Sequence, residues 1–247
     1  CVRDSSSAIK TEHLHEMNKR GLGGAIELHE GDLFKKGSYD KAFSGCSAVI
    51  HAGATVGFNR ETPQEVYDGC FTENEHVLSS IKKSNSVKRF VFTSSFAAIG
   101  HPRPEGHVFS EKDWCGDNVD GYKGAWTEDN ISKNRDIAYA MAKANTEKMI
   151  YKAAEEDGKF EAVSINPLHV IGPLMSENHN QFFSWQFFIL QLLKGKDFGF
   201  WNEKQIRPST MLWNMVDVRD VARAHRLAAE SLNAKNGSRY ILSASDR

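Results

Sequence analysis

Short apolar runs alternate with longer amphipathic segments along the whole chain. The runs are rich in Val, Ile and Phe and apolar on both faces, as strands buried between two layers are. We expect strands at residues 25–29, 47–51, 87–93, 160–166 and 239–243, with further extended segments at 1–4 and 215–218.

Between these runs the pattern predicts helices, because apolar residues recur there at three- and four-residue spacing. They are expected at residues 39–43, 62–83, 135–156, 182–194 and 219–232, and the polar segment at 5–18 is compatible with a helix. Alternating strands and helices predict an α/β fold, a doubly wound parallel sheet of the Rossmann type. We divide the chain into a dinucleotide-binding core at 1–173, a segment over the substrate region at 174–214, and a return to the core at 215–247.

Composition narrows the function classes. The 247 residues are 40% hydrophobic and 26% charged, with a net charge of -1. Near-neutral charge gives no support for nucleic-acid binding, and no apolar run approaches the roughly 18 residues of a membrane span. The four cysteines are scattered, which predicts neither a metal site nor a disulfide framework. A reducing compartment is therefore expected, without a specific localisation.

Small or polar residues follow the predicted strands. In parallel sheets, ligands bind at the carboxyl ends of the strands, so these residues should face one crevice. They are Asp32, Ala52, Gly53, Ser94, Ser95, Asn166 and Pro167.

A tyrosine and a lysine stand four residues apart in the helix predicted at 135–156. Alanines at 138, 140, 142 and 144 favour that helix, and nothing before Gly158 breaks it. Four-residue spacing places Tyr139 and Lys143 on one face, one turn apart. An ammonium beside a phenol favours the phenolate, so such a pair can exchange a proton with an alcohol or carbonyl oxygen. This spacing is also common on the solvent-exposed faces of helices. Whether the pair is catalytic must therefore be judged from the segments on either side.

The order of these local motifs resembles an extended short-chain dehydrogenase/reductase, nearest the dihydroflavonol-reductase and 3β-hydroxysteroid-dehydrogenase branch. Along the chain come strand–Gly-Asp-Leu, strand–His-Ala-Gly-Ala, strand–Thr-Ser-Ser, helix with Tyr-x-x-x-Lys, and strand–Asn-Pro-x-x-Val-x-Gly-Pro. The resemblance covers essentially the whole chain.

The resemblance implies a role for each matched residue. Tyr139 matches the catalytic acid/base, and Lys143 matches the lysine that assists it and binds the nicotinamide ribose. Ser95 matches the serine that holds the substrate oxygen, with Ser94 as runner-up. Cofactor contacts are implied at Tyr139 as well, and further ones at Asp32, Leu33, Ala52, Gly53, Ala54, Thr93, Pro167 and Val170.

Cofactor choice depends on Arg3. After the second strand of a dinucleotide fold, an acidic residue binds the ribose 2′-hydroxyl, whereas an arginine accommodates a 2′-phosphate. The resemblance places Arg3 for that phosphate, so NADP is favoured. The neighbouring Asp4 keeps NAD open.

The sequence departs from the family pattern in several places. The glycine-rich turn that would hold the pyrophosphate should precede Arg3 and is absent, as is the first strand, so taken literally the chain should bind dinucleotide poorly. The polar segment at 101–134 is longer than usual. Gly100 stands where flavonoid reductases carry a substrate-contacting asparagine, and the Asn-Trp-Tyr-Cys signature of cinnamoyl-CoA reductases is missing.

The favoured function is an NADP-dependent oxidoreductase that interconverts a small ketone or aldehyde and an alcohol. Two alternatives stay open: a nucleotide-sugar epimerase or dehydratase on the same scaffold, and a non-catalytic reductase-like subunit of a larger assembly. The family resemblance also raises a homodimer, in which the helices at 62–83 and 135–156 would pack between chains.

Overall fold

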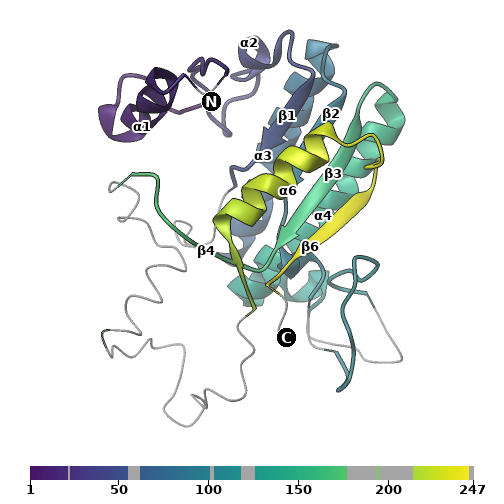
Figure 1. The fold of residues 1–247 in the computed structure, drawn as a ribbon. Helices are drawn as coiled ribbons and strands as arrows, with labels where there is room; N and C mark the ends of the chain where they lie inside the picture. The colour runs from purple at the N-terminus through teal and green to yellow at the C-terminus, as the bar shows by residue number, and fades with distance from the viewer. Residues whose placement is uncertain are drawn as a thin grey trace.

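A four-stranded parallel sheet forms the centre of the protein (Figure 1). The computed structural model describes residues 1–21, 23–54, 62–100, 103–117, 126–176, 194 and 214–244. The strand order is β1-β2-β3-β6. These strands are β1 (Ala48–His51), β2 (Arg89–Thr93), β3 (Glu161–Pro167) and β6 (Ser238–Leu242), close to the predicted runs.

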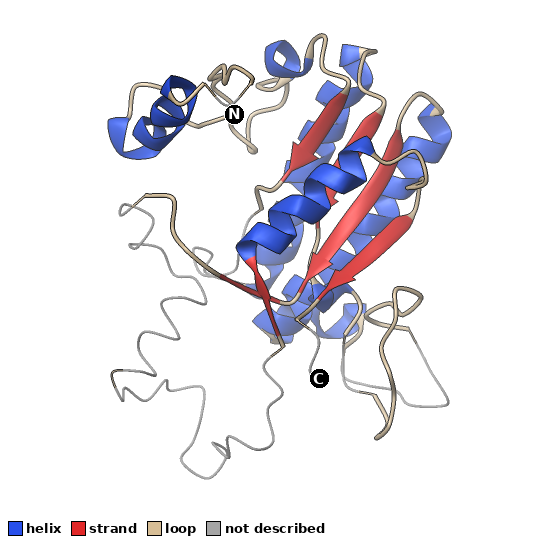
Figure 2. Cartoon of the chain, viewed as in Figure 1, coloured by secondary structure: helices blue, strands red, loops and turns tan. Residues whose placement is uncertain are grey.

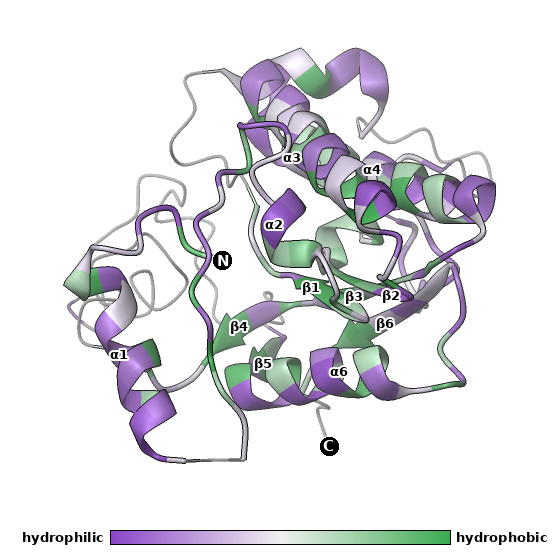
Figure 3. Cartoon of the chain, turned by 90° about the horizontal axis from the view of Figure 1, so that it is seen from above, coloured by the Kyte–Doolittle hydropathy of each residue, from purple (hydrophilic) through white to green (hydrophobic). Residues whose placement is uncertain are grey.

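Helices cover both faces of this sheet, as the doubly wound prediction requires. Helices α3 (Pro63–Ser84) and α4 (Arg135–Asp157) pack together on one face, and α6 (Val218–Glu230) lies on the other. Figure 2 shows the strands between these helices, and Figure 3, viewed from above, separates the three layers. The predicted α/β class is confirmed.

Side chains alternate along the central strands and so build two cores. Phe90 and Phe92 of β2 point toward α3 and α4, whereas Val91 between them packs with β3 and α6. All three are less than 2% exposed. Because successive strand residues point to opposite faces, a run buried on both sides needs an apolar residue at every position.

Helix α4 begins and ends where its local sequence directs. The Asn134 side chain accepts hydrogen bonds from the amides of Asp136 and Ile137, at 2.7 and 3.3 Å. At the other end Gly158 adopts a left-handed conformation, φ 66°, which glycine tolerates without strain. Helix α3 begins with a reciprocal capping box between Thr62 and Glu65.

The N-terminal part differs from the prediction. Helices α1 (Ala8–Lys19) and α2 (Asp40–Phe43) form as expected. The strand predicted at 25–29 was wrong, and the extended segment at 1–4 reduces to a single bridge that pairs Val2 with Glu30. A strand needs a neighbour for its amides, and among the described residues only this short contact supplies one.

Further differences lie on the C-terminal side of β3. The strand β4 (His169–Ile171), which the sequence did not predict, pairs in parallel with β5 (Met215–Asp217). The predicted helix at 182–194 lies outside the described residues, apart from Lys194. The 3₁₀ turn η2 (Phe96–Ala98) follows β2, and η3 (Glu128–Lys133) lies within the long polar segment; both pack on α4.

His51 ends β1 as a packed core residue. Its ring is 7% exposed, stacks against Phe90 and Phe92, and leaves Nε2 without a hydrogen-bond partner among the described residues. Burial, reinforced by the nearby charge of Lys143, lowers the pKa of His51 to about 4. The folded protein therefore holds this ring neutral well below the pH at which the unfolded chain protonates it.

This shift makes a pH-dependent contribution to stability. Between about pH 6.5 and pH 4 the unfolded chain binds a proton at His51 that the folded chain excludes, so stability falls as pH falls. We expect His51→Phe, which keeps the ring stacking, to lose about 2 kcal/mol less stability between pH 7 and pH 5 than the parent protein. Urea unfolding at both pH values measures this, and parallel losses in the two proteins would refute it.

Candidate active site

Four side chains form a row along the inner face of α4. They stand at four-residue spacing, so each lies one helical turn from the next. Going from the half-buried Tyr139 toward the helix C-terminus, the row enters the protein interior. Its members are Tyr139, Lys143, Glu147 and Tyr151.

Lys143 is buried between α4 and the end of β2. Its side chain is 3% exposed, and Nζ donates a hydrogen bond to the Thr93 carbonyl oxygen at 3.2 Å. The same atom lies 5.1 Å from the centre of the Phe92 ring and 5.8 Å from that of Tyr139. An ammonium carries three hydrogens. Among the described residues, one of them is used in a hydrogen bond, the one to Thr93. The charge can therefore also serve a ligand or the Tyr139 oxygen.

The two serines after β2 point in different directions. Ser94 is 4% exposed, and its hydroxyl donates a short hydrogen bond to Glu147. Ser95 is half-buried and caps η2, where its Oγ accepts from the Ala97 amide at 3.2 Å. Because η2 packs on α4, Ser95 lies at the same end of the sheet as Tyr139. Ser94 is thus occupied inside the protein, while Ser95 keeps partial access to solvent.

Thr93 links the site to the opposite face of the sheet. Its Oγ1 lies 2.7 Å from Nε2 of His225 on α6, and Nδ1 of His225 lies 2.7 Å from the Val221 carbonyl oxygen. Burial lowers the pKa of His225. In the neutral form Nδ1–H donates to Val221, so Nε2 accepts from the Thr93 hydroxyl. The hydrogen bond to His225 orients Thr93, whose carbonyl oxygen accepts the hydrogen bond from Lys143.

A second cluster forms where the loops after Glu30 and β1 approach each other. A Cβ built on Gly53 would lie 3.3 Å from Leu33 Cδ1, so the two segments are in close contact. The Leu33 carbonyl meets Nδ1 of His76 on α3 at 2.8 Å, and Asp32 Oδ1 accepts from the Phe34 amide at 2.9 Å. Gly53 itself is exposed, so a ligand can approach its backbone from solvent, on the side away from Leu33.

The remaining predicted residues lie around these clusters. Arg3 is exposed and close enough to Tyr39 for its charge to act on that phenol. Ala52 is exposed and Ala54 half-buried beyond β1. Pro167 is buried at the end of β3, and Val170 is half-buried in β4. Among the described residues, Arg3 makes no direct contact with Tyr139 or Lys143. A dinucleotide is long enough to reach from one of these positions to the other.

Sequence reasoning missed a buried polar cluster behind the tyrosine and lysine. Glu147 is fully buried and accepts from Arg239 Nε at 2.8 Å. Asn166, expected to face the crevice, is also fully buried and donates to both Glu147 and the Ser95 carbonyl. Two features of the sequence could have predicted this cluster. Glu147 follows Lys143 at the same four-residue spacing, and the apolar run at 160–166 contains the polar residues Ser164 and Asn166.

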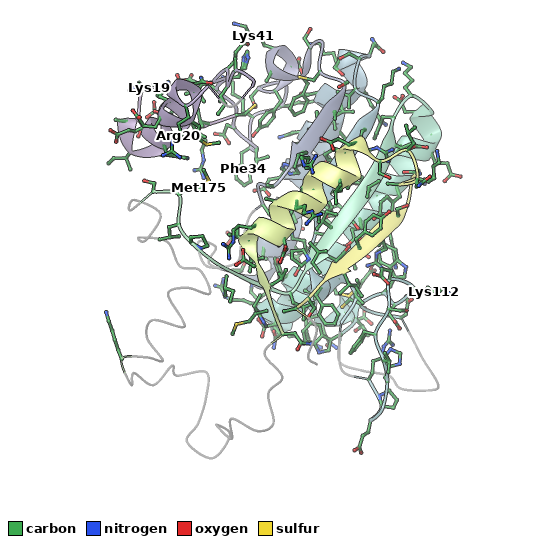
Figure 4. All side chains as sticks on the ribbon, in the orientation of Figure 1. Lys19, Arg20, Phe34, Lys41, Lys112 and Met175 are labelled. Carbon is green, nitrogen blue, oxygen red and sulfur yellow. The ribbon has the colours of Figure 1, made fainter. Side chains whose placement is uncertain are left out.

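Two large apolar side chains near the site are exposed to solvent. Phe34 and Met175 are 49% and 62% exposed and lie on the side of the sheet where α1 lies (Figure 4). Within the described ranges, no three His, Cys, Asp or Glu residues are grouped to hold a metal ion. Across the same ranges, no helix combines the length and the apolar character needed to cross a bilayer.

Comparisons with known proteins identify the family of this chain. The sequence model of the NAD dependent epimerase/dehydratase family matches residues 2–242. The chain is 31% identical over 245 residues to cinnamoyl-CoA reductase CAD2 of Medicago truncatula, covering 98% of this chain and 66% of that protein. It is 30% identical over 178 residues to dihydroflavonol 4-reductase of Arabidopsis thaliana, covering 71% of this chain and 43% of that protein.

A solved structure shows the same fold. Gre2 of Candida albicans in complex with NADPH superimposes with a TM-score of 0.73 at 25% identity, covering 98% of this chain and 69% of that one. The chain thus spans about two thirds or less of the length of these relatives. The match over residues 2–242 confirms the extended short-chain dehydrogenase/reductase resemblance: the chain belongs to the NAD dependent epimerase/dehydratase family.

Proposed function

We propose that the protein is an NADP-dependent reductase that interconverts a small ketone or aldehyde and an alcohol. The observation that carries the proposal is the placement of Tyr139 and the buried Lys143 on one face of α4, against the carboxyl end of β2. The named relatives are reductases, and the solved relative holds NADPH, which supports this choice within the family.

Three side chains divide the work at the carbonyl oxygen. Tyr139 gives its phenolic proton to that oxygen during reduction and takes it back during oxidation. Ser95 donates a hydrogen bond to the same oxygen and orients it. Lys143, held by Thr93, stabilises the negative charge that develops on the Tyr139 oxygen when the proton leaves.

The residues present fit a nicotinamide dinucleotide. When bound, NADPH would supply the hydride for carbonyl reduction, and NADP⁺ would accept it in the reverse direction. Lys143 has hydrogens left to donate to the ribose, the exposed backbone at Gly53 would meet the adenosine side, and Leu33 forms an apolar edge there. Arg3 provides a cation for a 2′-phosphate. Pro167 and Val170 would border the nicotinamide.

The substrate side next to Ser95 is aromatic. A Cβ at Gly100 would clash with the Phe96 ring, so this ring occupies the space that a side chain at position 100 would need. Phe96 in turn meets the Phe109 ring edge-on, with ring centres 5.4 Å apart. This wall offers apolar contact where a polar group at position 100 would offer a hydrogen bond. It favours an aliphatic or aromatic carbonyl compound without a polyhydroxylated ring.

The proton-transfer assignment predicts the effect of removing one oxygen atom. Tyr139→Phe should lower kcat by about 10²-fold or more, because general acid catalysis is lost. NADPH affinity, measured by quenching of tryptophan fluorescence, should change by less than about threefold, since ribose binding rests on Lys143.

Tyr67→Phe is the matched control, because Tyr67 packs in the same apolar cluster but bonds only to Asn145 among the described residues. Its kcat should stay near the parent value. Near-normal turnover by Tyr139→Phe would refute the mechanism. Tightly retained NAD with activity on nucleotide sugars would favour the epimerase alternative, and absence of both nucleotide binding and turnover would favour a non-catalytic subunit.

Cofactor preference should depend on Arg3. Loss of a charge-assisted hydrogen bond is worth about 1.5–3 kcal/mol, or roughly 10- to 100-fold in affinity. We therefore expect Arg3→Gln to weaken NADPH binding by about tenfold or more while NADH binding changes by less than about twofold. Arg20→Gln, at another exposed arginine of the N-terminal part, is the control. Equal losses for both cofactors would contradict the assignment.

A further inference from the structure

Glu147 is the centre of a buried hydrogen-bond network. Its side chain is fully buried one turn after Lys143. The Oε1 atom accepts from the Ser94 hydroxyl and, at 2.7 Å, from Asn166 Nδ2. The Oε2 atom accepts from Arg239 Nε at 2.8 Å and lies near the hydroxyls of Ser164 and Tyr151, at 3.1 and 3.4 Å.

The backbone explains why these groups meet. Alternate residues of β3 face α4, and two of them, Ser164 and Asn166, are polar. The strand register places Arg239 of β6 directly beside Ser164. Glu147 therefore lies over a strip of polar groups contributed by the residue after β2, by β3 and by the start of β6.

Each contact of Oε1 leads to the segment that carries Ser95. Ser94 directly precedes it, and its amide also donates to the Ile165 carbonyl oxygen at 2.9 Å. Asn166 uses its second amide hydrogen on the Ser95 carbonyl oxygen at 3.2 Å. Glu147 Oε1, on the helix that carries Tyr139, thus accepts hydrogen bonds from Ser94, which precedes Ser95, and from Asn166, which itself donates to Ser95.

Arg239 compensates the buried charge and reaches the long polar segment. Its Nη1 donates to the carbonyl oxygens of Glu111 and Asp113 at 2.9 and 2.6 Å, and its guanidinium lies 3.6 Å from the centre of the Trp114 ring. A buried ion pair rarely adds net stability compared with apolar residues of the same shape. Its several directional bonds instead suit a role in holding segments in fixed relation.

We propose that Glu147 is a positioning residue: held by Arg239, its carboxylate sets the position of Ser95 relative to Tyr139 and Lys143. This rests on the reductase function proposed above. Because Tyr139, Lys143 and Glu147 share one rigid helix face, any shift of the Ser95 segment relative to the tyrosine must break the bonds to Oε1. A displacement of about 1 Å at a reacting group can lower the rate by about 10²-fold.

A matched pair of double variants separates positioning from stability. Glu147→Gln/Arg239→Met and Glu147→Leu/Arg239→Met both remove the ion pair without leaving a lone buried charge. Glutamine can still turn its amide oxygen toward Ser94 and Asn166, whereas leucine cannot accept a hydrogen bond. Tyr151→Phe is the outer control, because it removes a contact to Oε2 and leaves Oε1 untouched.

The glutamine variant should keep kcat within about fivefold of the parent, and the leucine variant should fall at least about tenfold below the glutamine variant at a similar melting temperature. The KM for NADPH should change less than about threefold in both, and Tyr151→Phe should turn over normally. Equal kcat values for the two double variants, or rates that follow melting temperature alone, would overturn the proposal.

Hydrogen exchange of the peptide spanning 94–100 gives a readout that needs no turnover. Exchange should be faster in the leucine variant than in the glutamine variant and unchanged in Tyr151→Phe. If the parent protein reduces no carbonyl compound, the reductase function fails, and this exchange comparison still decides whether Glu147 holds the Ser95 segment. Identical exchange in all proteins would refute that role.

Discussion

The packing of helix α4 on the parallel sheet is the constraint on which the site depends. A four-residue repeat places Tyr139, Lys143 and Glu147 on one line facing β2 and β3. The sheet register then brings the ends of those strands opposite that line. Because Tyr139 and Glu147 both lie on α4, one rigid helix fixes their positions relative to each other.

This arrangement explains why charged groups are buried at the site. Lys143 is held by a carbonyl oxygen and two aromatic rings, which leaves its charge available to a ligand. Glu147 is satisfied by several donors, including Arg239, and in our proposal it contributes geometry rather than reactivity. The same helix face would then carry one group that takes part in the reaction and one that holds the neighbouring segments in place.

Much of this could be predicted from local sequence. The apolar runs of β2 and β3, the end of α4 at Gly158, and the tyrosine–lysine spacing depend on neighbouring residues, so the pattern alone revealed them. Glu147 and Arg239 are 92 residues apart, and only the sheet register brings them together. The three-residue strand β4 is too short to show a period and is defined by pairing with β5. Residues 25–29 carried an alternating pattern, but within the described part of the chain no neighbouring strand pairs with them.

The most direct test of the account follows the hydride. The protein would be incubated with NADPH deuterated at the transferred position and a panel of small aliphatic and aromatic aldehydes and ketones, and the products analysed by mass spectrometry. The account predicts an alcohol that carries one deuterium on the former carbonyl carbon. Retention of all deuterium in the nucleotide, with unchanged carbonyl compounds throughout the panel, would contradict it.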